Sequence, residues 1–496
     1  MITAASMAAS TMVAVDITIA NVALPHMQAT MSASQDQIVW VLTSYLVAGA
    51  IATPLTGWLA SRYGRKPMML ISVAGFSIAS FLCGIANNLE MIVFARLLQG
   101  AFGAGVVPLS QATLLDINPP HRHAKAMAIF ALGSMLGPLL GPTLGGWLTD
   151  SLSWRWVFFI NLPFGLLSFV LMSAFMYDSR DAHPGRFDLF GFAWLAIGLA
   201  AFQLMLDRGE QQDWFESTEI WIYAVVLALS VWSTVVHIAT ARNTFIRPEL
   251  FKDRNFAIGC IIAASVGVVA FATIPLIVVM QQNLLGYSAL HTGVVGVSRG
   301  IGTVAAILLV TRLANRFDAR IFLGLGLAVT AISSLMYART DLYVDDWTLI
   351  VIGLVQGMGG GFMFLPLSLI VFSTLPGALR NEGAAMFALT RNIGNSVGIS
   401  YLQRQLVHHT AWSQSRLVEA VRPDNPMFAY ARPDFDWDSG QAMARMSGEI
   451  ARQAAMVGNV EVFWMVFFAG MAMLPLLLFM RDAGDKSGRE TLPPIE

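Results

Sequence analysis

Asp16 is the residue of this sequence that could carry chemistry in the least expected place. It lies in the stretch VAVDITIANVALP, residues 13–25, and no other charged residue occurs between Met1 and Gln35. An ionised side chain at the centre of a bilayer costs roughly 2.5–3.5 kcal/mol even on the lenient insertion scale, so other groups must offset that cost. Burial disfavours the ionised form of a carboxyl group, whereas a nearby cation favours it. A carboxyl group balanced between these two effects can bind and release a proton.

Three arginines in otherwise apolar segments could supply the neighbouring cation: Arg96, Arg299 and Arg391. We expect Asp16 to be a proton-coupling residue beside one of them. The alternative is a structural role, in which Asp16 is permanently neutral or permanently paired. The scarcity of other membrane-buried acids favours a proton-coupling role for Asp16. The other acids near apolar segments all lie at expected helix ends; these are Glu90, Asp116, Asp207 and Glu382.

The other residue types that could do chemistry are sparse or poorly spaced. Cys83 and Cys260 lie far apart inside expected helices, so neither a disulfide framework nor a metal cluster is predicted. The histidines have no spacing suited to metal binding or to acyl transfer, which leaves a polytopic membrane enzyme as a remote alternative; they are His26, His121, His123, His183, His237, His291, His408 and His409. We expect no metal and no cofactor.

The composition indicates which elements must position these residues. Charged residues make up 12% of the 496 residues, hydrophobic residues make up 56%, and the mean hydropathy is +0.63, whereas about 25% of a typical soluble domain is charged. Backbone groups in lipid must be paired within their own segment, so the expected fold is an all-α polytopic membrane protein. A net charge of −1 gives no electrostatic basis for binding nucleic acid.

The sequence predicts fourteen membrane-spanning helices, each with about 20 apolar residues. The first runs from about residue 3 to 26, residues 255–298 hold two helices with a turn at 283–293, and one at 383–403 is interrupted by Arg391. The other ten follow charge-free runs at 38–60, 68–89, 97–115, 126–149, 156–177, 189–206, 220–241, 321–338, 347–379 and 462–480.

The distribution of lysine and arginine predicts the orientation. With the N-terminus inside, the inner loops and the C-terminal tail carry 18 basic residues, whereas the short outer loops carry only Arg155, Arg208 and Arg339. Both ends are therefore expected in the cytoplasm. The start of the sequence does not resemble a cleavable signal peptide. We expect a short polar leader ahead of the first helix, with a naturally short start as the alternative.

Weak internal repeats relate the two halves of the chain. LASRY at 59–63 resembles LANRF at 313–317, an offset of 254 residues. At an offset of 257–258, Gln99, Gly100, Pro108, Leu109 and Ser110 correspond to Gln356, Gly357, Pro366, Leu367 and Ser368. At 257, Ala131, Leu132, Gly137 and Gly141 correspond to Ala388, Leu389, Gly394 and Gly398. Duplicated halves are typical of transporters.

The repeat predicts three domains: a six-helix bundle at 1–180, two extra helices at 181–254, and a second six-helix bundle at 255–496. The second bundle includes a hydrophilic outer loop at 406–458. Its segments RPDNP and RPDFDWD indicate turns, and SGQAMARMSGEIARQAAMVG indicates a short amphipathic helix resting on the membrane surface. The alternative is a docking surface for an external partner.

Two glycine-containing motifs have a physical interpretation. In GSMLGPLLGPTLGG a glycine occurs at every fourth position, so the four form a smooth groove that another backbone can approach closely, while two prolines bend the helix; these residues are Gly133, Gly137, Gly141, Gly145, Pro138 and Pro142. The groove indicates either static packing or a flexible seam that shapes a cavity. In GWLASRYGRKPMML we expect an inner gate formed by Gly57, Arg62, Gly64, Arg65 and Lys66, beyond a simple positive-inside signal.

These motifs resemble those of the major facilitator superfamily, in its 14-helix drug:proton antiporter branch of EmrB/QacA type, and the resemblance covers essentially the whole chain. The loop 2–3 motif matches Gly57, Leu59, Arg62, Gly64, Arg65 and Lys66, the helix 4 motif matches Arg96, Gln99 and Gly100, and the antiporter motif matches Gly133, Gly137, Pro138, Gly141, Gly145 and Gly146. DITIANVALP, WRWVFFINLP, LDRGEQQDWF and LFKDRNF resemble signatures of the branch.

The resemblance implies two six-helix bundles with two linker helices, and a central cavity lined by helices 1, 4 and 10. Arg96 and Arg299 then become the better partners for Asp16, and Arg391 a further cavity charge. It also implies a possible periplasmic adaptor of EmrA type and an outer-membrane channel. The chain departs from the pattern at Ser61, where the family usually has an acid. Hydrogen bonds and helix-end charges would therefore have to close the inner gate.

We therefore expect a proton-coupled antiporter in a bacterial inner membrane that exports hydrophobic drugs or other lipophilic compounds by alternating access. One buried acid against up to three arginines favours neutral or weakly acidic substrates, and the methionines and phenylalanines fit an adaptable apolar pocket. The alternative is a proton symporter that imports a small metabolite, which the glycine motif disfavours by family association only.

Overall fold

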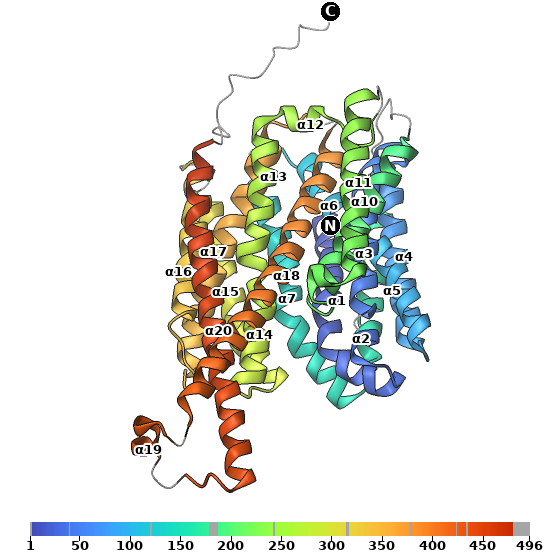
Figure 1. Cartoon of the computed structure of the whole chain (residues 1–496). Coiled ribbons are helices and arrows are strands. Elements are labelled where there is room, and N and C mark those ends of the chain that lie inside the picture. Colours follow the sequence, from blue (N-terminus) through green and yellow to red (C-terminus); the bar gives the residue numbers. More distant parts are fainter. Residues whose placement is uncertain are drawn as a thin grey trace, which may run out of the picture.

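The computed structural model describes residues 2–38, 40–119, 122–177, 187–241, 244–313, 317–376, 379–422, 424–432 and 435–479, and within these ranges every regular element is helical. The long helices run side by side in one bundle (Figure 1). The short helix α12 lies at one end of the bundle and α19 lies beyond the other end. We call these the α12 end and the α19 end.

The first half of the chain contributes helices that pack mainly against one another. α5 and α6 are two parts of one span, as are α8 and α9. The bounds are α1 (Ile2–Met31), α2 (Gln35–Ile38), α3 (Trp40–Tyr63), α4 (Arg65–Ile85), α5 (Leu89–Gly103), α6 (Val106–Ile117), α7 (His123–Ser151), α8 (Trp156–Phe159) and α9 (Asn161–Phe175).

Two helices then follow at the periphery, α10 (Leu189–Gly209) and α11 (Thr218–Thr240). α10 packs against α3 and α11. α11 buries only Ile220 and Ser230, so most of its apolar surface faces outward, as expected for a helix surrounded by lipid. The turn η2 (Trp214–Glu216) joins the two, and α12 (Glu249–Lys252) leads into the second half.

The second half repeats the arrangement of long helices. Its first span contains two π-helical segments, η3 and η4, and the turn expected at 283–293 is present, with Gly286 at a positive φ of 73°. The bounds are α13 (Arg254–Val266), η3 (Gly267–Phe271), α14 (Thr273–Val279), η4 (Met280–Leu284), α15 (Ala289–Leu313), α16 (Ala319–Tyr337), α17 (Asp346–Ser373), α18 (Arg380–Ala420), α19 (Pro426–Ala431), α20 (Gly440–Met473) and η6 (Leu474–Phe479).

Twelve helical segments among the described residues are long and apolar enough to cross a membrane. They include the expected first span and both spans within residues 255–298. The remaining two expected spans correspond to α7 and α18, which have 29 and 41 residues. Both are long enough to cross, but they are not among the twelve, so the count of fourteen stays a prediction for them.

Within the expected outer loop at 406–458, the prediction of a separate helix on the membrane surface is wrong. α18 continues to Ala420 and α20 begins at Gly440, so the sequence assigned to a helix on the membrane surface is the first part of a long helix. The two helices form a hairpin that projects past the α19 end (Figure 1). They pack through Gly458, where a Cβ atom would approach Thr410 Oγ1 to 2.5 Å. Hydropathy detects only the lipid-facing part of a helix, and no proline or glycine stops α18 between 399 and 420.

Candidate functional site

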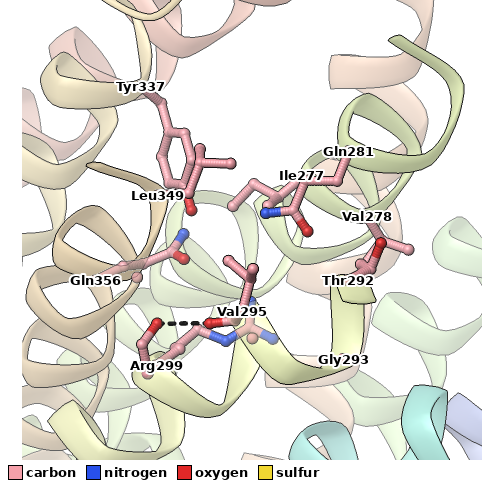
Figure 2. A pocket seen from close by; sticks show the side chains of 13 residues that line it. Ile277, Val278, Gln281, Thr292, Gly293, Val295, Arg299, Tyr337, Leu349 and Gln356 are labelled. Carbon is pink, nitrogen blue, oxygen red and sulfur yellow. Dashed lines mark hydrogen bonds between the residues drawn. The ribbon is translucent and has the colours of Figure 1, made fainter. Parts of the chain in front are cut away.

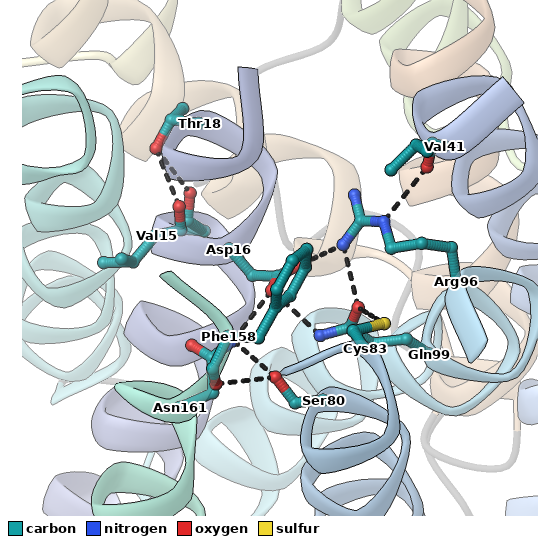
Figure 3. A network of polar contacts seen from close by, with 11 residues as sticks. Val15, Asp16, Thr18, Val41, Ser80, Cys83, Arg96, Gln99, Phe158 and Asn161 are labelled. Carbon is teal, nitrogen blue, oxygen red and sulfur yellow. Dashed lines mark hydrogen bonds and ion pairs between the residues drawn. The ribbon is translucent and has the colours of Figure 1, made fainter. Parts of the chain in front are cut away.

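Asp16 and Arg96 form an ion pair inside the first half of the bundle. The distance from Arg96 Nη1 to Asp16 Oδ2 is 2.7 Å, and the two side chains are 1% and 0% exposed. α1 carries Asp16 near its middle and α5 carries Arg96, so two helices position the pair (Figure 3). A buried pair of this kind is stable only if further hydrogen bonds satisfy the remaining lone pairs and protons.

Those further hydrogen bonds come from two side-chain amides. Gln99 Nε2 donates to Asp16 Oδ1 at 2.8 Å, and Asn161 Nδ2 donates to the same oxygen at 2.7 Å. Asn161 also donates to Ser80 Oγ at 2.9 Å, and Ser80 donates to the carbonyl oxygen of Phe158. The carboxylate therefore accepts three N–H groups, one of them from the guanidinium.

Arg96 is held from several sides. Its Nε donates to the carbonyl oxygen of Val41 at 3.1 Å, and its Nη1 also donates to Gln99 Oε1 at 2.8 Å. The guanidinium lies 4.2 Å from the ring centroid of Tyr45, which provides a cation–π contact. Asp16, Gln99 and Tyr45 together neutralise and pack the arginine. A proton can reach this cluster only after the surrounding helices move, because its charged and amide side chains are at most 1% exposed.

The glycine motif of α7 fixes the position of the helix that carries Asp16. A side chain at Gly137 would collide with the backbone of Ala14 and Val15, and one at Gly141 would collide with Thr18. Thr18 Oγ1 also donates to the carbonyl oxygen of Gly137 at 3.1 Å. Close packing of α7 on α1 is therefore one role of these glycines.

The outer glycines of the motif extend the same seam. Gly133 accepts a hydrogen bond from Thr11 Oγ1 at 2.7 Å, and a Cβ atom at Gly145 would approach Ile19 to 2.9 Å. Pro138 and Pro142 lie within α7, and their side chains are outside the described part of the structure. The second role expected for this glycine groove, a flexible seam that shapes a cavity, stays a prediction.

The expected gate residues lie where the two halves meet at the α12 end. Gly57 on α3 approaches the second half so closely that a Cβ atom there would lie 3.1 Å from the backbone of Asn381 and Glu382. Gly64 has φ 98° and ψ 151°, which allows the turn from α3 into α4. Lys66 donates to the carbonyl oxygen of Ser173 at 2.8 Å. Arg62 is exposed.

Arg65 connects this loop to both halves. It forms an ion pair with Asp116 at the end of α6, and its Nε donates to Asn381 Oδ1 at 2.5 Å. Asp116 also accepts from Arg380 Nη1 at 2.6 Å. At the position where the family usually has an acid, Ser61 accepts a hydrogen bond from Asn381 Nδ2 at 3.3 Å. Hydrogen bonds and helix-end charges therefore link the halves here.

Arg299 and Arg391 lie in the second half, away from Asp16. Arg391 on α18 lies 5.7 Å from the ring centroid of Phe364. Arg299 on α15 lines a narrow cavity of about 30 Å³ with Gln356 and Tyr337 (Figure 2). Among the described residues, no carboxylate lies within ion-pair distance of either guanidinium.

The sequence did not single out several members of the Asp16 cluster. Gln99 and Asn161 lie within the motifs described above, whereas Tyr45 and Ser80 lie outside all of them. The available signal was polarity, since an amide within an apolar span must find a partner. Groups of three or more metal-ligating side chains do not occur within the described ranges.

Comparisons with known proteins agree with this architecture. The sequence model of the Major Facilitator Superfamily matches residues 6–399. The chain is 34% identical over 494 residues to the multidrug export protein EmrB of Haemophilus influenzae, which covers 97% of this chain and 95% of that protein. It is 31% identical over 478 residues to the fatty acid resistance protein FarB of Neisseria gonorrhoeae, covering 93% and 92%.

A solved structure shows the same fold at low sequence identity. The proton:xylose symporter XylE superposes with a TM-score of 0.62 at 13% identity, over 97% of this chain and 95% of that one. The expected all-α major facilitator fold is thereby confirmed.

Proposed function

Because this chain belongs to the major facilitator superfamily, in the drug:proton antiporter branch that includes the EmrB proteins, we propose that it is a proton-coupled exporter of lipophilic compounds. The multidrug export proteins EmrB, which match nearly the whole chain, support this direction of transport. The fold alone does not set the direction, since a proton:xylose symporter shares it. The proton gradient drives the cycle, without a bound cofactor and without an enzymatic step.

Asp16 is the proton-coupling residue in this proposal. The buried ion pair of Asp16 and Arg96 is the main observation that supports this role. Protonation of the carboxylate would remove one charge and leave Arg96 uncompensated inside the bundle. An uncompensated buried charge is costly, so the cluster would have to rearrange and open to water. Proton binding is thereby coupled to a change in the side-chain contacts that connect α1 to α5.

The network around Asp116 forms the inner gate in this proposal. Arg65 from the first half and Arg380 from the second half share one carboxylate, so separating the halves at the α12 end breaks an ion pair. Gly57 and Gly64 permit the close approach that brings these groups together. Arg62 and Lys66 flank the same turn as cytoplasmic surface charges.

The α12 end faces the cytoplasm of a bacterium in this proposal, because the expected inner loops carry most of the basic residues. The hairpin of α18 and α20 then projects to the outside of the inner membrane. Its tip carries an aromatic cluster of Phe428, Phe435 and Trp437, with ring centroids 4.8–5.4 Å apart. An EmrA-type adaptor that leads to an outer-membrane channel would contact this tip, and co-purification with and without residues 421–439 tests that contact.

The decisive experiment follows a lipophilic fluorescent substrate in liposomes under an imposed pH gradient. We expect Asp16→Asn to abolish gradient-driven transport, because the amide cannot exchange a proton, while substrate binding survives. Glu90→Gln is a matched control, since it neutralises an exposed carboxylate in the first turn of α5. Equal gradient-driven transport by the native chain and Asp16→Asn would make Asp16 structural.

A further inference from the structure

The two halves of the chain contain structurally equivalent sites around Asp16 and Arg299. The offset of 257 residues relates Gly100 to Gly357, and the offset of 254 relates Tyr45 to Arg299. The structure supports the second relation independently. A Cβ atom at Gly100 would collide with the carbonyl oxygen of Tyr45, and a Cβ atom at Gly357 would collide with the carbonyl oxygen of Arg299. Arg299 therefore occupies the place of Tyr45.

The equivalent of Asp16 is a neutral residue. The offset of 257 that relates Gln99 to Gln356 also relates Asp16 to Thr273. The hydrogen bond is kept as well, because Gln99 Nε2 donates to Asp16 and Gln356 Nε2 donates to Thr273 Oγ1 at 3.2 Å. The second half thus keeps the glutamine and its partner position but has a hydroxyl group where the first half has a carboxylate.

The second half nevertheless contains a cation, at the position of Tyr45 rather than that of Arg96. Arg299 extends from α15 into the cavity between α14, η4, α15, α16 and α17 (Figure 2). Within the part of the chain that the structure describes, this arginine has no carboxylate partner, unlike Arg96. A partly buried cation without a counter-ion is unfavourable unless an anion can join it. The positive charge of Arg299 in this cavity is therefore left for a ligand to balance.

Polar groups around the cavity have unused hydrogen-bonding capacity. Thr292 Oγ1 and Gln356 Oε1 are buried and have no hydrogen-bond partner within the described residues. Thr292 and Gln356 are 3% and 6% exposed. Both side chains line the same cavity as Arg299, so the hydroxyl can donate to an acceptor group of a ligand there, and the amide oxygen can accept from a donor group. Buried polar groups are normally paired, so these two atoms are available to a ligand in the cavity.

The walls of the cavity indicate what that ligand carries besides its charge. Apolar side chains face the same space, namely Ile277, Val278, Val295 and Leu349. A volume of about 30 Å³ accommodates only a small group in this conformation. An acidic headgroup fits next to Arg299, and the apolar body of the ligand would lie along these side chains once the helices separate.

We propose that Arg299, with Thr292 and Gln356, binds the carboxylate of lipophilic acids in the second half of the transporter. This inference rests on the proposed function and names its substrate class. Proton coupling at Asp16 and anion recognition at Arg299 are then separated into equivalent places of the two halves. An anionic lipid headgroup presents related chemistry, so the test must distinguish a lipid from a substrate.

The experiment measures binding of dodecanoate and of methyl dodecanoate, its neutral ester, to the full chain in phosphatidylcholine nanodiscs. We expect Arg299→Gln to weaken dodecanoate binding about 10- to 100-fold, because hydrogen bonds to a charged group are lost. Binding of the methyl ester should be unchanged, which also shows that the variant is folded. Arg299→Lys should retain most of the affinity for dodecanoate.

Two matched variants keep the result interpretable. Arg391→Gln removes the other embedded arginine and should leave the dodecanoate affinity nearly unchanged. Thr292→Val keeps the shape of the side chain but removes its hydroxyl group, and should weaken dodecanoate binding several-fold without affecting the ester. An unchanged dodecanoate affinity in Arg299→Gln, or a loss in Arg391→Gln instead, would overturn the assignment.

Lipid binding at Arg299 and a failure of transport each give a distinct result. Competition by phosphatidylglycerol in the nanodiscs, lost in Arg299→Gln, would show that the site binds a lipid headgroup and would overturn the substrate assignment. Failure of the proposed function would show itself differently, as an absence of gradient-driven transport by the native chain in liposomes. Binding at Arg299 is measured without a gradient, so the two failures are distinguishable.

Discussion

The Asp16 cluster and the Arg299 cavity share one framework but differ in charge balance. In both, a glycine lets two helices approach closely, and a glutamine donates to the first membrane-spanning segment of its half. The first half completes the framework with an internal ion pair, whereas the second half leaves its cation unpaired among the described residues. The two halves therefore share the packing of a glycine and the hydrogen bond of a glutamine, but they differ in which charged residues surround that glutamine.

The largest expected difference concerns stability. Arg96→Gln leaves the buried Asp16 carboxylate without its cation, so we expect it to lower the free energy of unfolding by about 3–5 kcal/mol. Arg299→Gln removes a cation that has no carboxylate partner in the described structure, so it should change stability by less than about 1 kcal/mol or increase it. Unfolding of both variants in detergent, followed by circular dichroism, measures this. An equal loss of unfolding free energy in the two variants would show that the two arginines do not differ in charge compensation.

A smaller effect tests the close helix packing that the two sites share. Gly100→Ala and Gly357→Ala each place a methyl group against the backbone oxygen of the neighbouring helix. Overpacking of this kind costs about 1–3 kcal/mol, and we expect similar losses at both positions in the same unfolding measurement. Gly360→Ala on α17 is a suitable control, because a Cβ atom there meets nothing within 4 Å. A loss at only one of the two sites would show that the halves are packed differently.

The sequence predicted the elements better than the contacts between them. Charge-free runs located the spans, and the four-residue glycine spacing correctly indicated a close-packed groove on α7. Three arginines were candidates for Asp16, and only the three-dimensional packing selects Arg96, because spacing along one helix does not determine which faces of two helices meet. Thr273 could not be recognised, since a threonine in an apolar span has no distinctive pattern until its equivalence to Asp16 is known.

The error at 406–458 has a similar physical cause. Hydropathy reports where a helix meets lipid, and it does not report where the helix ends. The segment after residue 403 is polar and rich in helix-forming residues, so α18 continues into water. Turn residues correctly indicated a break, but the break is confined to the region between Ala420 and Gly440.

Because α18 is one uninterrupted helix, a movement at one of its ends is transmitted to the other end. Asn381 at its first turn lies in the contact between the halves, and Ala420 at its last turn lies at the base of the projecting tip. With 41 residues the helix is roughly 60 Å long, so a tilt of about 5° at one end displaces the other by about 5 Å. In the proposed transport cycle, opening of the contact at the α12 end would therefore move the far end of α18, and a fluorescent label at the tip could measure that displacement.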